Sequence, residues 1–182
     1  MHDVGMVKLK NDTANSTRYF INVAGFGFSG CVAERIELKN KWLKVGAAGF
    51  VLGMADALFR YTAASVHLYA NGNNREGRFI NLSIGICRFA GGGMKLTPDS
   101  IADDGLFDVT VAGDLSKAEV IANIPRLFSG SFVRNKKVIQ FRTDKIRITS
   151  VPQLPIETDG EFLGYGEAEI EIIPSAIKTI TD

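Results

Sequence analysis

The feature that most constrains the fold is a two-residue alternation of apolar and polar side chains in three segments of the chain. Residues 65–70 alternate in this way, residues 80–86 place four apolar side chains on one face, and residues 167–173 oppose three apolar side chains to three glutamates. Successive side chains of a strand point to opposite faces, so this period predicts strands with one buried face. Such strands are typical of antiparallel sheets.

Turn and capping signals place these strands among helices. Asn71-Gly72 between two alternating runs predicts a tight hairpin. One helix is expected to begin near Cys31, and a second to run through Trp42 to about Tyr61, with a break near 45–46. A third is predicted from a capping box at Ser116 to Gly130, with Pro125 kinking it or shifting its start. Further strands are expected at 19–23, 106–111, 138–141, 145–150 and 155–158. The predicted fold class is therefore α+β, a mainly antiparallel β two-sheet sandwich-like domain with two or three helices.

Length and composition predict a single domain over residues 1–182, since 46% hydrophobic content is enough for one buried core. Residues 1–15 are expected to form a flexible lead-in.

With 21 basic and 20 acidic residues, no basic patch indicates a nucleic-acid partner. Cys31 and Cys87 are interpreted as buried free thiols of a reducing compartment, and no signal peptide is expected after Met1. The most apolar stretch, 45–59, is shorter than the roughly 20 residues that span a bilayer.

Gly25-x-Gly27-x-x-Gly30 matches the dinucleotide-binding fingerprint in its letters. The fingerprint also needs a parallel βαβ unit with an acidic residue after the next strand, and residues 65–70 contain no acid. Phe26 and Phe28 would crowd a pyrophosphate. A tight strand-to-helix turn at a domain interface is therefore favoured over a nicotinamide site, which would require a parallel sheet at residues 19–70.

Two short acidic clusters carry the chemistry. Residues 103–108 read Asp-Asp-Gly-Leu-Phe-Asp, and residues 158–161 read Thr-Asp-Gly-Glu. Each sets carboxylates around a glycine, where the backbone turns sharply and carbonyl oxygens can point with the side chains. That arrangement suits a hard cation such as magnesium, or a carboxylate base beside a phosphate chain. Taken singly, each cluster is also compatible with a solvated turn.

The ordered series of motifs resembles a known family. The series is Phe20–Gly27, Gly91–Met94 with Pro98, Asp103–Val109, and Thr158–Glu161. In this order and spacing it is similar to the C-terminal domain of the bacterial diacylglycerol kinase and related lipid kinases, whose relatives include the sphingosine kinases. The resemblance runs from about residue 17 to the end. The family's nucleotide-binding N-terminal domain carries a Gly-Gly-Asp-Gly-Thr motif that this sequence lacks, so the resemblance implies the second domain alone, inactive by itself.

The resemblance also implies roles for individual residues. Glu161 corresponds to the family's general base, Asp159 is the second candidate, and the sequence leaves the choice open. The other turn resembles a structural Mg²⁺ site, with a carboxylate oxygen from Asp104 and the carbonyls of Leu106 and Ile101 as ligands. ATP is implied as co-substrate, bound mainly by the missing N-terminal domain. The apolar helices around 50–59 and 124–132 either line a slot for the acyl chain or pack in the core.

The expected function is that of the C-terminal domain of an ATP-dependent lipid kinase, which transfers the γ-phosphate to a hydroxyl of diacylglycerol or a related lipid. The alternative is a catalytically silent lipid-binding or regulatory module of the same fold. The expected partners are a lipid substrate, the chain's own N-terminal nucleotide-binding domain, a membrane touched peripherally and, through exposed sheet edges, a second copy. A cytoplasmic, peripherally membrane-associated location follows from the same resemblance. Both acidic turns are expected to converge on one rim of the molecule.

Overall fold

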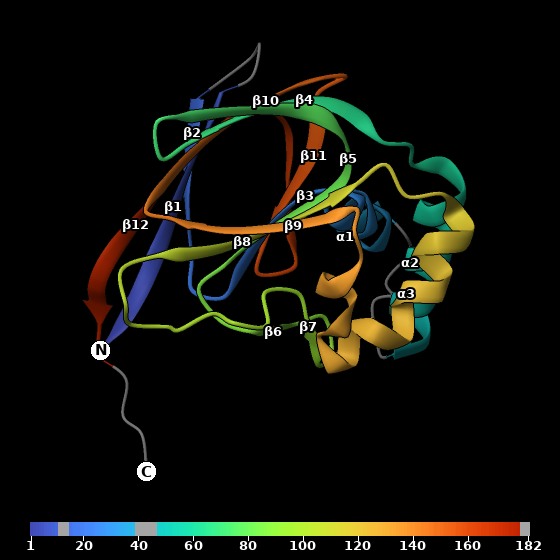
Figure 1. Cartoon of the computed structure of the whole chain (residues 1–182), viewed down its shortest axis with the longest axis horizontal. Helices are drawn as coiled ribbons and strands as arrows, with labels where there is room; N and C mark the ends of the chain where they lie inside the picture. The colour runs from blue at the N-terminus through green and yellow to red at the C-terminus, as the bar shows by residue number, and fades with distance from the viewer. Residues whose placement is uncertain (11–14, 39–46, 179–182) are drawn as a thin grey trace.

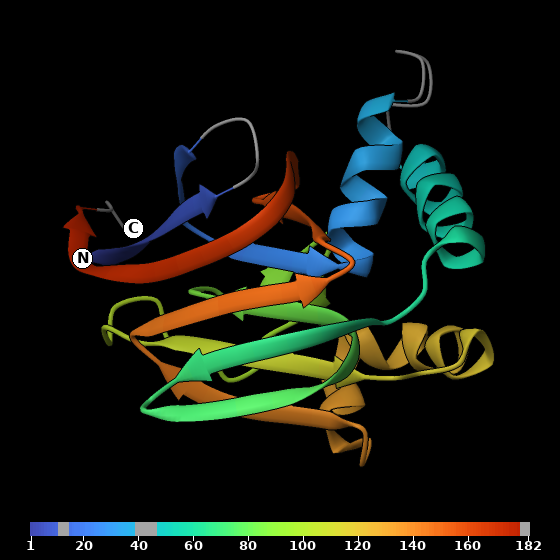
Figure 2. The same ribbon diagram turned by 90° about the horizontal axis from the view of Figure 1, so that it is seen from above.

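The computed structural model describes residues 1–10, 15–38 and 47–178, which form a barrel-like β domain with its helices gathered on one side (Figures 1 and 2). The elements in chain order are β1 (His2–Lys10), β2 (Asn15–Phe20), β3 (Val23–Gly27), α1 (Phe28–Leu38), α2 (Ala47–Arg60), β4 (Ala64–Ala70), β5 (Asn73–Gly85), β6 (Phe89–Ala90), β7 (Met94–Lys95), β8 (Phe107–Gly113), α3 (Lys117–Ser129), the 3-10 turn η2 (Ser131–Arg134), β9 (Val138–Thr143), β10 (Lys145–Val151), β11 (Leu154–Thr158) and β12 (Glu161–Ile177).

The main sheet curves until it closes on itself. Its strands follow the order β10-β4-β5-β3-β11-β12, and β12 pairs in turn with β10. Two pairs extend this ring: β8 and β9 continue from β5, while β1 and β2 continue from β12. Every strand pairing of the sheet in the described residues is antiparallel. The α+β, mainly antiparallel, sandwich-like fold predicted from the sequence is confirmed, and the described residues contain three helices where two or three were expected.

The core fills the inside of this ring. Burial alternates along β4 as the period of two predicts, with Val66 and Leu68 buried and His67 and Tyr69 exposed. Phe20 of β2 stacks on Phe107 of β8 with ring centroids 5.8 Å apart. Beyond Phe79, β5 is buried on both faces, because one face meets the core and the other lies beneath the helices. That second face contributes to the candidate site.

Local signals account for the helix ends. Gly27 takes a φ of 90°, a conformation open to glycine, and α1 starts at the next residue. At α3 the capping box is confirmed: Ser116 Oγ accepts from the amide of Glu119, whose carboxylate accepts from the amide of Ser116. Gly130 ends that helix in the left-handed conformation, and Pro125 lies inside it without shifting its start. None of the helices in the described part has the length and apolar character needed to cross a bilayer.

The expected flexible lead-in is wrong over His2–Lys10, which forms β1 between β12 and β2. Val7 and Leu9 of this strand are buried in the core, so β1 is held by apolar packing as well as by its ladders. Most of the polar run that suggested disorder, residues 11–14, lies outside the described residues. So does the expected helix break near 45–46, together with Trp42.

Candidate functional site

The ends of four neighbouring strands bring the two acidic turns to one edge of the sheet. Thr158 at the end of β11 pairs near the start of β3, through Ala24, and Ala24 pairs with Ile84 near the end of β5. Ile84 pairs in turn with Val109, near the start of β8. The turn at 159–160 and the turn before β8 therefore lie at the same end, three strand spacings or about 14 Å apart. We call this end of the sheet the acidic rim.

The first turn of the rim is a two-residue hairpin between β11 and β12. Asp159 and Gly160 both take positive φ, 50° and 88°, which is the conformation of the tight hairpin turns. The carboxylate of Asp159 accepts three backbone hydrogen bonds, from Ile21 (2.9 Å), Asn22 (3.0 Å) and Val23 (3.1 Å). Asp159 therefore fastens this turn to the junction of β2 and β3.

Glu161 differs from Asp159 in its freedom. It is the first residue of β12, it is exposed, and its carboxylate makes no hydrogen bond or ion pair with the residues that the structure describes. The oxygens of Asp159 are taken by amides, whereas those of Glu161 are open to an incoming group. This difference separates two candidates that the sequence could not rank.

The second turn of the rim precedes β8 and is held by an arginine. One oxygen of Asp104 accepts from the amide of Leu106 (3.1 Å), and the other pairs with the guanidinium of Arg142 on β9. Arg142 Nε also lies 3.4 Å from an oxygen of Asp108. Burial raises the pKa of Asp108, and the facing guanidinium opposes that rise.

A fully buried carboxylate anchors this second turn from below. Asp3, on β1, accepts from the amide of Gly105 (2.8 Å) and from that of Ser175 on β12 (2.7 Å). Its own amide donates to the carbonyl of Ala102. Sequence reasoning missed Asp3 because it stands in the segment expected to be flexible. No local pattern marks it, since its partners lie about a hundred residues or more away in the chain.

The expected Mg²⁺ ligands lie at this turn, but the positively charged side chain of Arg142 already pairs with one of them, Asp104. Magnesium is usually held by one or two carboxylates, with waters or phosphates completing its shell. Here the guanidinium of Arg142 pairs with one oxygen of Asp104, and the other oxygen accepts from the amide of Leu106. Within residues 1–10, 15–38 and 47–178, no group of three or more acidic, histidine or cysteine side chains could hold a metal ion. The site at Asp104, Leu106 and Ile101 stays a prediction, and it would require Arg142 to release Asp104.

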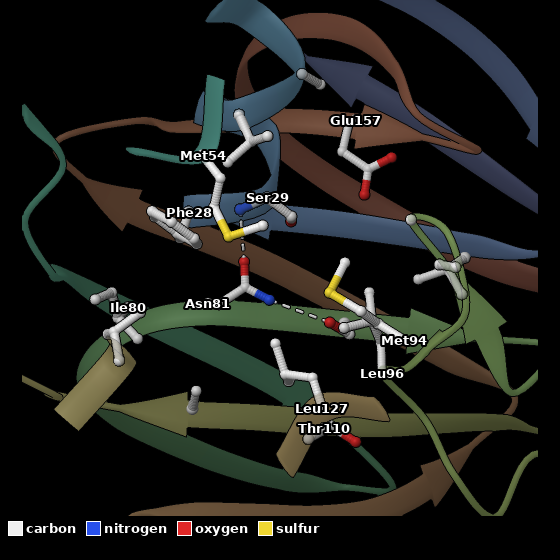
Figure 3. A pocket seen from close by; sticks show the side chains of 18 of the residues that line it. Phe28, Ser29, Met54, Ile80, Asn81, Met94, Leu96, Thr110, Leu127 and Glu157 are labelled. Atoms are coloured by element: carbon white, nitrogen blue, oxygen red, sulfur yellow. Dashed lines mark hydrogen bonds between the residues drawn. The ribbon is translucent and has the colours of Figure 1, made fainter. Parts of the chain in front are cut away.

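A cavity of about 410 Å³ opens beside the first turn, between the outer face of the sheet and the three helices (Figure 3). Asn22, Asp159 and Gly160 line it at the acidic rim. The remainder is mostly apolar, and both helices that the sequence offered as an acyl-chain slot contribute to it. The principal apolar residues of the lining are Phe28, Val32, Ile36, Met54, Leu58, Met94, Leu96, Ile124 and Leu127.

A buried glutamate faces this cavity. The side chain of Glu157 on β11 is directed from the sheet toward the middle of the pocket (Figure 3), and the residue is only 7% exposed. Burial raises the pKa of its carboxyl to about 7, the amide of Gly160 (2.9 Å) acts in the opposite direction, and the negative charge of Asp159 adds to the rise. The sequence gives no sign of this, because Glu157 looks like an ordinary polar residue of a strand.

The glycines of the fingerprint-like segment serve close packing at this place. A Cβ on Gly25 would lie 2.2 Å from both Glu157 Oε1 and Ser29 Oγ, and one on Gly30 would lie 2.2 Å from the carbonyl oxygen of Pro155. The strand that carries Gly25, β3, is antiparallel to both of its neighbours, β5 and β11. The parallel unit required for a nicotinamide site at residues 19–70 is thus absent from the part of that range that the structure describes.

These features define a barrel-like β domain with a ligand-sized apolar cavity that ends at an acidic turn. The chain belongs to a known family of such domains: residues 22–181 match the model of the YegS C-terminal NAD kinase beta sandwich-like domain. This family is the one to which the sequence motifs pointed.

Relatives of the chain carry kinase names. It is 33% identical over 172 residues to a probable lipid kinase YegS-like protein of Xanthomonas campestris, covering 93% of this chain and 55% of that protein. It is 30% identical to a diacylglycerol kinase of Staphylococcus carnosus, covering 91% of this chain and 54% of that one. The crystal structure of a diacylglycerol kinase from Bacillus anthracis shares the fold, with a TM-score of 0.60 and 20% identity over 95% of this chain and 50% of its own. The chain spans about half the length of these relatives.

Proposed function

We propose that this chain is the lipid-holding half of an ATP-dependent lipid kinase, which transfers the γ-phosphate to a hydroxyl of diacylglycerol or a related lipid. One observation carries the proposal: the apolar cavity ends at the turn of Asp159 and Gly160, directly before Glu161 at the start of β12. A lipid chain in that cavity would bring its polar end close to Glu161, whose carboxylate has no partner among the described residues. The names of the relatives support a kinase, although each is about twice as long as this chain.

In this mechanism Glu161 acts as the general base. Its carboxylate takes the proton of the lipid hydroxyl while that oxygen forms a bond to the γ-phosphorus, and the bond from phosphorus to the bridging oxygen breaks to leave ADP. Asp159 acts as a positioning residue: by holding the amides of Ile21 to Val23 it fixes the turn from which Glu161 extends. ATP and its Mg²⁺ would be bound by a separate nucleotide-binding domain.

The surface of the acidic rim supports docking of that domain. Ile21, Phe89 and Ile101 are all about half exposed or more, and contacts between their segments place them near the rim. The carbonyl of Asn22 accepts from the amides of Ile86 and Cys87, and Arg88 donates to the carbonyl of Ser100 (2.9 Å). Apolar side chains exposed beside a candidate catalytic turn are suited to a protein partner. We also propose that the whole enzyme is cytoplasmic and touches the membrane peripherally to reach its lipid.

The second candidate is a catalytically silent lipid-binding module. The cavity supports this second candidate, because it is formed within this chain and would hold a lipid without any nucleotide. The two candidates differ in whether Glu161 matters for phosphate transfer.

The test is a kinase assay on the protein that carries both halves, with labelled γ-phosphate and a panel of lipid alcohols. Glu161→Gln should lower the rate at least a hundredfold if Glu161 is the base, since general-base catalysis contributes about 10²- to 10⁴-fold. Glu76→Gln, at the far end of β5, is the matched control and should keep the parent rate. A Glu161→Gln rate within threefold of the parent would remove the catalytic role.

A further inference from the structure

The rim end of the cavity contains a small polar cluster within apolar surroundings. It consists of Glu157, Ser29 and Asn22, and the lack of a side chain on Gly25 lets the first two approach each other. Ser29 Oγ and Asn22 Oδ1 are buried without a hydrogen-bond partner. Buried polar atoms without partners are costly, so they indicate groups that a ligand satisfies.

We propose that this cluster, which we call the headgroup cluster, binds the polar head of a lipid through hydrogen bonds that the head donates. The head is then a hydroxyl or an amino group, and Glu157 is its principal contact. This inference rests on the proposed function, because it specifies which lipids the cavity admits.

The charge of the cavity supports a head that donates rather than accepts. Glu157 and Asp159 are the only charged side chains among the described residues that line it, and both are acids. The unpaired atoms Ser29 Oγ and Asn22 Oδ1 can each accept a hydrogen bond. A carboxylate or phosphate head would meet two acids without a counter-charge, so the cavity should exclude it.

The size of the cavity suits a lipid chain. Its volume of about 410 Å³ lies within the range of roughly 300–1,000 Å³ that is typical of small-molecule pockets.

The protonation of Glu157 separates the two kinds of head. With a pKa of about 7, Glu157 is mostly neutral at pH 6 and mostly ionised at pH 8. An ammonium head pairs with the ionised form, so its affinity should rise with pH, whereas a hydroxyl head gains nothing from the charge. Arg35 is engaged with Asp56 at 3.5 Å, and Glu34 accepts from Tyr165. Besides Asp159 and Tyr61, the ionisable groups on α1 and β12, which pack against β11, are Cys31, Glu34, Arg35, Glu37, Glu161, Tyr165, Glu167, Glu169 and Glu171.

The test is binding of three ten-carbon probes to the chain by calorimetry, without ATP. Decylamine and 1-monodecanoylglycerol should bind, and decanoate should bind at least tenfold more weakly at pH 8. The affinity for decylamine should rise about tenfold from pH 6 to pH 8, following the ionised fraction of an acid with a pKa near 7. The methyl NMR signals of Met54 and Met94, which line the cavity, should shift, while those of Met1 and Met6 should not.

Three variants complete the test. Glu157→Gln should abolish the pH dependence for decylamine, and Ser29→Ala should weaken 1-monodecanoylglycerol several-fold. Glu76→Gln serves as the control and should match the parent. Equal affinity for decanoate and decylamine, or an unchanged pH profile in Glu157→Gln, would overturn the proposal. Because no nucleotide is present, failure here leaves the kinase proposal intact, and failure of the kinase assay leaves this one intact.

Discussion

The two acidic turns of the rim look alike in sequence and are held in opposite ways. Asp159 gives its carboxylate to three backbone amides, so its turn is fixed by the main chain. Asp104 gives one oxygen to its own turn and the other to Arg142, so its turn depends on a side chain from β9. The comparison teaches that a carboxylate next to a glycine does not define a role. The hydrogen-bond and ion-pair partners of the carboxylate decide whether it fixes a turn, acts as a base or binds a metal ion.

The largest effect is expected at the first turn. Asp159→Ala should lower the free energy of unfolding by about 3–4 kcal/mol, because three amides lose a charged acceptor and alanine is strained at a φ of 50°. Asp159→Asn is the control, since asparagine tolerates this φ and keeps one acceptor oxygen; it should lose less than half as much. Urea titration measures both. Equal losses in the two variants would mean that the hydrogen bonds that asparagine keeps contribute little.

The next effect concerns the buried acid beside that turn. A folded-state pKa of about 7 lies above the ordinary value of 4.5, so the folded state binds more protons than the unfolded state. The contribution of Glu157 to the free energy of unfolding should therefore be fully present below pH 4.5. It should be lost as the pH rises to 7, by on the order of 2–3 kcal/mol.

Glu157→Gln removes this ionisation and should be more stable than the parent at pH 8. At about 2–4 °C per kcal/mol, the melting temperature should rise by roughly 5–10 °C. The difference should vanish near pH 5. A parent whose stability is constant from pH 5 to pH 8 would show that Glu157 does not titrate in this range.

The smallest effect is expected at the second turn. Arg142→Met leaves Asp104 and the buried Asp108 without their cation, and should lower stability at pH 7 by about 1–2 kcal/mol, a modest loss because the arginine is 42% exposed. The pKa of Asp108 should rise further. Thermal melts in MgCl₂ sharpen the comparison: if Arg142 excludes the metal, Mg²⁺ should stabilise the variant more than the parent. Equal stabilisation would mean that Arg142 and the ion do not compete.

How much the sequence predicts depends on the range of the interaction. The strands, the hairpin at Asn71 and the caps of α3 follow from residues within a few positions of each other, and these predictions were confirmed. The role of Asp3 was not predictable, because it depends on partners at 105 and 175 that only the closed sheet brings near. The burial of Glu157 likewise depends on distant segments, since α1 packs on β11 and Gly25 of β3 pairs with Glu157.

The candidate site shows the same division. The motifs indicated which turns to compare and the family, but not that the oxygens of Asp159 are taken or that Arg142 covers Asp104. Both facts depend on which strand lies beside which, a property of the sheet order. The position of both turns at one edge was expected from the resemblance, and the strand register bears it out.

The long strand β12 has a consequence for how the domain opens. Its first residues pair with β11, and residues 168–171 pair with β10 on one side and with β1 on the other. Breaking the pairing with any one of these strands leaves β12 held by the others, so partial opening of the sheet releases little of it. Amide protons at Ala168 to Ile170 should be among the last to exchange with deuterium, and a pulling force applied along this strand should meet a single abrupt rupture rather than stepwise peeling.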